Sequence, residues 1–333
     1  AYELSTAASY ATSGREGQGA YTDISNGQFD PRNGANRYRD YLEDIYVGYK
    51  WYETADEMGF WDSADARERW GIENGYDDVV QFPFGFGLSY SEFEWSVDSI
   101  SPDDGATLTA DGKITLNVVV KNVGDVPAKD VVQVYYSAPY YTGGIEKSSI
   151  NLVAFAKSKL LEPDESEIIP ISFDVEDMKS YDCYDRNDNG FMGYELEAGE
   201  YEITLRTDVH TLKEIERGRG QNTYTFTVPS ADGEKTGFKY ETDSATGNKV
   251  ENRFTTFTNE STGASSEIYE PAVLAAHSID GSEEPTKLTY VTRADFAGTF
   301  PYEKEPNRAA GKELYDTTYR IKIMPVNKVY GDD

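Results

Sequence analysis

The chain has 333 residues, enough for two domains of ordinary size, because a single core seldom grows beyond about 250 to 300 residues. Its formal net charge is -29, from 60 acidic and 31 basic side chains, and a field of this sign repels phosphate backbones and anionic lipid surfaces. We therefore expect no nucleic-acid partner, and no apolar run approaches the roughly 20 residues that membrane insertion by this segment would need.

One cysteine and two histidines limit the chemistry of the chain. Cys183 stands alone, which excludes an intrachain disulfide and a cysteine-based metal site. His210 and His277 have no Ser/His or Cys/His constellation around them, and we expect His210 to be a surface or interdomain hydrogen-bonding residue. Carboxylates are the only plentiful catalytic groups, and we expect no metal and no cofactor. The lone cysteine and the acidic surface fit an extracellular or cell-surface protein marginally better than a cytoplasmic one.

The first ninety residues mix irregular chain with a predicted helix. Residues 1–30 are rich in Gly, Ser, Thr and Ala without a sustained period, which predicts irregular surface chain. Residues 37–54 (RYRDYLEDIYVGYKWYET) place apolar side chains three and four positions apart, the period of one amphipathic helix or two short ones, although Gly48 weakens its middle. In residues 81–90 (QFPFGFGLSY), Pro and Gly separate the aromatic residues, which predicts a turn where backbone passes close to another surface.

Beyond Glu92 the hydrophobic period changes to two, and seven runs bounded by Gly, Pro, Asp or Asn have the character of strands. They cover residues 93–100, 113–124, 130–139, 152–161, 166–175, 199–208 and 222–229. Their number and spacing predict an immunoglobulin-like or fibronectin-like β-sandwich.

The last hundred residues have no compact domain pattern. Residues 231–285 are dominated by Thr, Ser, Asn, Gly, Glu and Lys, which predicts a linker or an embellishing loop. Residues 286–333 recover strand-like runs in LTYVTRADFAGTFP and YRIKIMPVNKVY, and we expect them to pack on something outside this chain.

One loop begins like an EF-hand. Asp185, Asn187, Asn189 and Gly190 match its first six positions, but position twelve is Leu196 where the motif requires a bidentate Glu. Asn, Asp and Gly also favour the positive φ angles of a turn between two strands. The sequence therefore predicts a turn here and no metal site.

The aromatic side chains are the candidates for sugar binding. Trp61 and Trp70 are our predicted substrate-binding residues, because aromatic faces offer apolar area to the C–H side of a sugar ring. Trp51 is a weaker candidate because it shares the helical stripe, and core packing is the commoner fate of all three. We expect the phenylalanines of QFPFGFGLSY to form a structural plug between domains.

These motifs carry a resemblance to glycoside hydrolase family 3. QFPFGFGLSY followed by SEFEWS resembles the segment that closes the α/β-sandwich domain of this family, and EDIYVGYKWYET resembles its EGIYVGYRYYD, departing at Asp44, Lys50 and Trp51. NVVVKNVGDVPAKDVVQVYYSAP and INLVAFAKSKLLEPDESEIIPISF resemble the fibronectin type III-like domain that follows. VTRADFAGTFP resembles the stretch that precedes the barrel in members with reversed domain order.

The resemblance implies a mainly β fold in which an irregular C-terminal extension follows two domains. We expect the terminal part of an α/β-sandwich domain at 1–91 and a fibronectin type III-like (immunoglobulin-like) β-sandwich at 92–230. The linker or embellishing loop at 231–285 would then lead to an extension at 286–333, which continues into or packs on a (β/α)8 barrel outside this sequence.

The resemblance also limits the expected function. Retaining hydrolysis in this family uses an Asp on the barrel and a Glu acid/base usually carried by the second domain, with the two carboxyls about 5 to 5.5 Å apart. Neither motif stands in this sequence, so we assign no catalytic residue. The expectation is an accessory, structural portion of a retaining β-glucosidase-like hydrolase acting on terminal β-linked sugars. Its partners would be the missing barrel, the rest of the α/β-sandwich domain and, through the complete enzyme, a β-glucoside or oligosaccharide. The alternative is a non-catalytic extracellular carbohydrate-binding or adhesion module.

Overall fold

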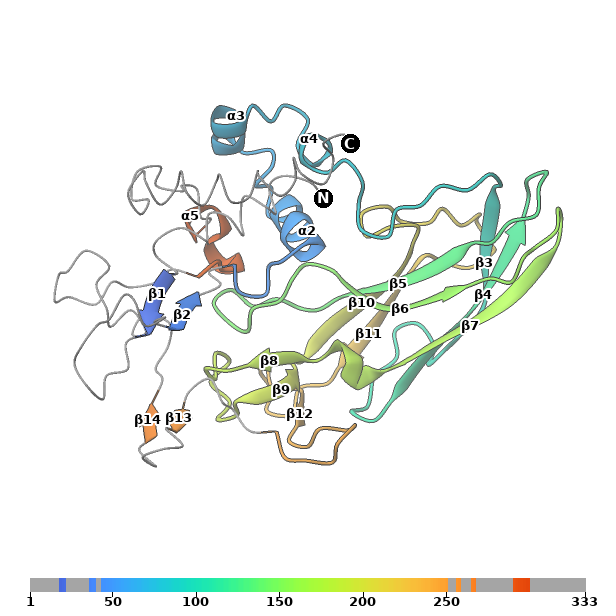
Figure 1. Cartoon of the computed structure of the whole chain (residues 1–333). Coiled ribbons are helices and arrows are strands. Elements are labelled where there is room, and N and C mark those ends of the chain that lie inside the picture. Colours follow the sequence, from blue (N-terminus) through green and yellow to red (C-terminus); the bar gives the residue numbers. More distant parts are fainter. Residues whose placement is uncertain are drawn as a thin grey trace, which may run out of the picture.

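The structure is a computed structural model that describes residues 18–21, 36–39, 43–250, 256–258, 265–267 and 290–299. Strands predominate within these ranges, and a small group of helices lies at one end of the strands (Figure 1). The mainly β fold expected from the sequence is confirmed.

Two antiparallel sheets form the β-sandwich. The first has the order β3-β4-β7, and the second has the order β11-β10-β5-β6. In chain order the seven strands are β3 (Phe93–Ser101), β4 (Lys113–Asn122), β5 (Val131–Ser137), β6 (Asn151–Lys157), β7 (Ser166–Asp174), β10 (Gly199–Arg206) and β11 (Thr223–Val228). Each of the seven predicted strands is confirmed.

Alternating side chains build the core between these sheets. In β4 the buried side chains are Ile114, Leu116, Val118 and Val120, and the residues between them face the other side. They pack in one cluster with buried residues of the second sheet such as Phe226. The period of two in the sequence therefore encodes this core directly.

A proline and a buried asparagine are accommodated in the sandwich by their positions in the strands. Pro170 lies in β7, an edge strand of its sheet, where the missing N–H leaves no ladder bond of a central strand unmade. Asn122 is fully buried at the end of β4, and its amide donates to the carbonyl oxygens of Val126 (2.8 Å) and Leu161 (2.9 Å). Its Oδ1 accepts from the Ser91 hydroxyl at 2.6 Å. The Asn122 side chain thus links the end of β4 to the two loops that contain Val126 and Leu161.

A small third sheet extends the sandwich, with the order β12-β9-β8. Its strands are β8 (Ser180–Asp182), which follows the short helix η2 (Val175–Met178), then β9 (Gly193–Leu196) and β12 (Phe238–Tyr240). β12 belongs to the region that we predicted to be a linker or an embellishing loop, so part of that region adds a strand to this sheet. A further hairpin joins β13 (Thr256–Thr258) to β14 (Ser265–Glu267).

The helix predicted at residues 37–54 is wrong in its first half. β2 (Asn36–Arg39) pairs with β1 (Gln18–Tyr21), which also corrects part of the irregular chain expected at residues 1–30. Among the described residues of this range, helix begins with α2 (Tyr49–Glu57), because Gly48 before it has φ 57° and ψ -135°, a conformation that does not belong to a helix. The sequence period was correct for α2 but was carried too far upstream.

Two shorter helices follow α2. α3 (Ala64–Trp70) begins where the Ser63 hydroxyl accepts the N–H of Ala66 at 3.1 Å, and it ends at Gly71, whose φ of 68° is left-handed. α4 (Tyr76–Val79) is a single turn that leads into residues 81–90.

The chain returns to the helices near its end. η4 (Arg293–Asp295) and α5 (Phe296–Thr299) form a short helical segment where the sequence suggested a strand-like run. Phe296 is buried in one cluster with Trp51, Phe60 and other residues of the helical part. This segment therefore packs on its own chain, and the remainder of 286–333 lies outside the described residues.

Candidate functional site

We call α2, α3 and α4 with the residues between them the helical part, and η4 with α5 (Arg293–Thr299) the return segment. Together they enclose an aromatic core. α2 buries Trp51 and Tyr52, and Phe296 lies 5.0 Å from Trp51 and 5.8 Å from Phe60 between ring centroids. The Trp61 indole N–H donates to the Tyr52 carbonyl at 3.0 Å. These rings therefore bury area against each other, which holds the helical part as one body.

The two predicted substrate-binding residues differ in what the structure describes of them. Trp61 is 0% exposed within the aromatic core, so its ring does not stand in an open cleft of the described residues. The side chain of Trp70 at the end of α3 lies outside the described residues. Contact between sugar and either tryptophan stays a prediction.

A carboxylate, an imidazole and a phenol join the helices to the sandwich. Glu53 on α2 is 7% exposed, and its Oε2 lies 3.0 Å from Nδ1 of His210, which follows β10. Its Oε1 accepts from the hydroxyl of Tyr76, whose ring stacks on His210 at 3.8 Å between centroids. The hydrogen-bonding role expected of His210, as a surface or interdomain residue, is confirmed by this contact. No feature of the sequence pointed to Glu53 or Tyr76 as its partners.

These contacts change the acidity of the groups. The hydrogen bond to Glu53 raises the pKa of His210 above its usual value, although burial opposes that rise. Burial, together with the hydrogen bond to Glu53, raises the pKa of Tyr76. The imidazole is therefore more readily protonated and the phenol stays neutral, so the cluster is an ion pair with a neutral donor whenever His210 carries its proton.

The segment 82–90 is held to the sandwich through its backbone. The Phe84 carbonyl accepts the N–H of Val209 at 2.8 Å, and the Gly85 carbonyl accepts Nε2 of Gln133 at 3.0 Å. Gly85 has φ 86°, and a Cβ there would collide with the Gln133 side chain. The close backbone approach expected for this segment is confirmed.

The side chains of this segment face outward. Phe82, Phe84 and Phe86 are 52%, 44% and 42% exposed, and Leu88 and Tyr90 are more exposed still. Phe84 also stacks on Tyr49 of α2, with 4.6 Å between centroids. We call Phe82, Phe84, Phe86, Leu88 and Tyr90 the aromatic strip. A plug between domains would be covered on both sides, whereas the described residues cover this strip on one side only.

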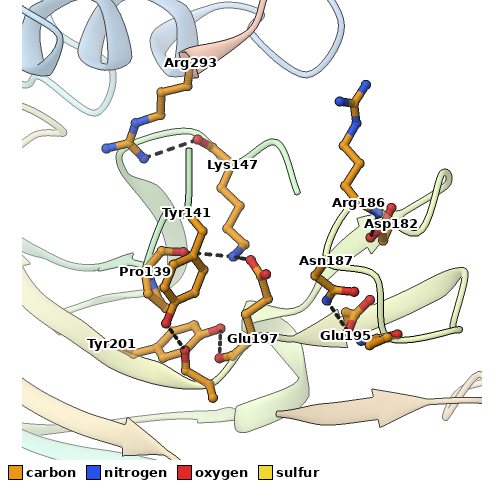
Figure 2. A network of polar contacts seen from close by, with 12 residues as sticks. Pro139, Tyr141, Lys147, Asp182, Arg186, Asn187, Glu195, Glu197, Tyr201 and Arg293 are labelled. Carbon is orange, nitrogen blue, oxygen red and sulfur yellow. Dashed lines mark hydrogen bonds and ion pairs between the residues drawn. The ribbon is translucent and has the colours of Figure 1, made fainter. Parts of the chain in front are cut away.

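A buried polar network fixes the return segment and the loop before β6 (Figure 2). Glu146 accepts from the Thr292 hydroxyl and from the N–H of Arg293. The Arg293 guanidinium, 7% exposed, bonds Glu57 and the carbonyl of Lys147. The Lys147 ammonium in turn pairs with Glu197 in the interior, and burial lowers the pKa of Lys147. Segments far apart in sequence are thereby locked together.

The described surface of the sandwich is hollowed beside β3. A hollow of about 580 Å³ lies beside Phe93, Trp95 and Lys213, but Trp95 is 2% exposed and its N–H donates to Asp130. Within the described ranges, no group of three or more His, Cys, Asp and Glu side chains is arranged to hold a metal ion. None of the helices described has both the length and the apolar character that a membrane span requires.

Comparison with known proteins agrees with this geometry. Residues 130–209 match the family described as Fibronectin type III-like domain. A β-glucosidase of Ruminococcus albus is 38% identical over 174 residues, which cover 52% of this chain and 15% of that protein. For β-glucosidase A of Butyrivibrio fibrisolvens the identity is 36% over 180 residues, covering 52% of this chain and 19% of that protein.

Solved structures with a similar region include β-glucosidases. β-Glucosidase 3B from Thermotoga neapolitana in complex with glucose has a TM-score of 0.40 and 31% identity, covering 57% of this chain and 20% of that chain. The chain thus spans less than a quarter of the length of the relatives that it matches. The resemblance to glycoside hydrolase family 3 is confirmed over about half of the sequence, around a fibronectin type III-like domain at residues 130–209.

Proposed function

We propose that this chain is the accessory, structural portion of a retaining β-glucosidase-like hydrolase that acts on terminal β-linked sugars. The observation that carries the proposal is the match to β-glucosidases over 52% of this chain, which accounts for only 15% and 19% of two of those proteins. The catalytic carboxylates would then belong to the part of the enzyme outside this sequence, with the missing barrel and the rest of the α/β-sandwich domain as partners.

The contacts at the site support a bracing role. Glu53 with His210, and Glu146 with the return segment, bind the helical part to the sandwich from two sides. A sandwich fixed in this way can hold a neighbouring domain at a constant angle. The aromatic strip supplies exposed apolar area beside this rigid joint, and such area is typical of a surface that another domain covers. We propose that the rest of the hydrolase packs on the strip.

Two measurements on the same preparation test the accessory role. The native protein should have a mass well above the 37.2 kDa of this chain and should release p-nitrophenol from p-nitrophenyl β-glucosides. The 333-residue chain alone should release none. Hydrolysis by the chain alone would contradict the proposal.

A pair of leucine variants in the native protein tests the role of the strip. Leu88→Ser should lower the hydrolysis rate severalfold, because Leu88 is 89% exposed here and would be covered in the complete enzyme. The matched control is Leu160→Ser, at an exposed leucine of the sandwich, which should leave the rate unchanged. If Leu88→Ser hydrolysed the substrate as fast as Leu160→Ser, the neighbouring domain would not pack on the aromatic strip.

A second candidate is a carbohydrate-binding or adhesion module without chemistry, and the exposed rings of the aromatic strip favour it. Stacking on sugars needs accessible aromatic faces, which Phe82 and Phe86 provide. A native species of 37.2 kDa that binds glycans without hydrolysing them would establish this function in place of the first.

A further inference from the structure

Three carboxyl groups are buried at the third sheet, and within the described residues only one of them is paired with a cation. Asp182 in β8 is 2% exposed, and Glu195 in β9 and Glu197 directly after β9 are both 0% exposed. Glu197 forms an ion pair with the ammonium of Lys147. An ionised carboxylate without such a partner is very unfavourable in a protein interior, where the group takes up a proton instead. The other two acids are thus the ones that a proton would neutralise.

Hydrogen bonds distinguish Asp182 from Glu195. Each oxygen of Asp182 accepts a backbone N–H of the following loop, at 3.0 Å and 2.7 Å, and these bonds oppose the rise in the pKa of Asp182 that burial causes. Glu195 instead accepts both of its bonds on Oε2, from the amides of Asn187 (3.0 Å) and Asn189 (2.7 Å), as Figure 2 shows for Asn187. Its Oε1 is buried without a hydrogen-bond partner. Glu195 is therefore the acid that is least suited to carry a charge.

The side chains around Glu195 also oppose its ionisation. Burial raises the pKa of Glu195, and the charges of Asp182 and Glu197 add to the rise, whereas its two amide donors oppose it. Figure 2 shows the guanidinium of Arg186 directed away from Glu195. The nearest acids thus act in the same direction as burial.

The cations on neighbouring elements are engaged elsewhere. Lys147, in the loop before β6, attracts Glu195, but its ammonium bonds Glu197 and a backbone carbonyl. Lys239 on β12 lies opposite Glu195 in the strand ladder, but it is exposed and its ammonium donates to the Asn189 carbonyl at 3.0 Å. Neither lysine therefore neutralises Glu195.

We propose that Glu195 keeps its proton in the folded protein at neutral pH, and that losing this proton opens the loop of residues 183–192. A neutral carboxyl is tolerated in the dry interior, whereas a carboxylate with an unpartnered oxygen draws in water. The loop gives way first because side-chain amides, those of Asn187 and Asn189, close it over Glu195, while Asp185 fixes its curl from within the loop. The loop is then a pH-sensitive cover on the third sheet, and this inference does not depend on the proposed function.

The direction of the pH dependence follows from the two states of the chain. An unfolded glutamate ionises at about pH 4.3, and the pKa of Glu195 is raised on folding. The stability that the neutral acid provides is therefore complete below about pH 4.3 and is lost as the pH rises through the folded pKa. Glu195→Gln keeps the shape of the neutral acid and cannot ionise, so it should escape this loss.

Melting temperatures of the full chain test the proposal. Glu195→Gln should melt several degrees above the parent at about pH 8, and the gap should shrink as the pH falls towards about 5. The control is Glu200→Gln, at an exposed glutamate of β10, which should follow the parent at every pH. If Glu195 were ionised and held the loop by its charge, Glu195→Gln would melt below the parent, and this result would overturn the proposal. Equal melting temperatures at every pH would overturn it as well.

Two further measurements locate the proton and the opening. The infrared difference spectrum between the parent and Glu195→Gln at neutral pH should contain the band of a protonated carboxyl. If that band disappeared in Glu197→Gln instead, the proton would belong to the other acid and the proposal would fall. Hydrogen exchange in residues 183–192, compared at equal pH, should be severalfold faster in the parent than in Glu195→Gln at about pH 8.5 and equal near about pH 5.5. Equal exchange at both values would show that ionisation does not open the loop.

Discussion

The sandwich core and the aromatic core of the helical part are built by different rules. In the sandwich, each strand contributes alternate residues such as Leu116 and Phe226, so the pattern within a strand already defines its buried face. The aromatic core is incomplete until Phe296 arrives from the return segment, and Arg293 reaches Glu57 across 236 positions. One core is specified locally and the other by contacts between distant segments, so the two should respond differently to substitution.

The largest effect is expected where buried charges cross between segments. Lys147→Met should lower the free energy of unfolding by about 4 kcal/mol, because it leaves Glu197 buried without its cation. The double variant Lys147→Met, Glu197→Leu should lose less than the single one. Lys113→Met is the control, because its pair with Asp174 is about half exposed and should contribute less than about 1 kcal/mol. Urea denaturation measures all three, and a single variant as stable as the control would show that the buried pair holds nothing together.

The next test compares one residue from each core. Phe296→Ala and Leu116→Ala should each cost about 3 kcal/mol, since both remove a large buried side chain. Hydrogen exchange measured by segment should show the loss for Phe296→Ala in residues 43–80 and the loss for Leu116→Ala across the sandwich strands. If Phe296→Ala weakened protection equally in both regions, the two cores would be one cooperative unit.

The smallest effect concerns pH. The pKa of His210 is raised in the folded protein above its unfolded value of about 6.5, so the pair with Glu53 stabilises fully below about pH 6.5. This contribution is lost as the pH rises through the folded pKa. It should stay below about 1 kcal/mol because the imidazole is 36% exposed. His210→Phe keeps a ring on Tyr76 but cannot titrate. Its stability should therefore vary less than that of the parent between about pH 5.5 and 8.5. Identical profiles of stability against pH would show that the pair of His210 with Glu53 does not contribute to stability.

The extent to which the sequence predicted the structure follows the same division. The seven sandwich strands were predicted because burial on one face leaves a period of two, and even Pro170 fits an edge strand. The helix at residues 37–54 was extended too far because its apolar spacing continues across Gly48 into a strand that pairs with β1. The partners of Glu53 could not be predicted, because no periodicity links α2 to a residue that follows β10.

The same reasoning explains the loop at residues 185–196. Reading the motif position by position compared Leu196 with the glutamate that an EF-hand requires, and therefore predicted a plain turn. Which neighbour of Leu196 faces the loop depends on how β9 is oriented between β8 and β12, and only the fold shows that Glu195 does so.

In residues 82–90, the backbone attaches the segment to the sandwich, whereas the side chains form its outward surface. The carbonyls of Phe84 and Gly85 fasten the segment to the sandwich, and these groups are the same whatever side chains stand there. Gly85 is constrained by its neighbour Gln133, and the ring of Phe84 is held by its stacking on Tyr49. The backbone anchorage would therefore persist if the more exposed side chains, Leu88 and Tyr90, were exchanged, so what the segment presents outward can change without loosening its attachment.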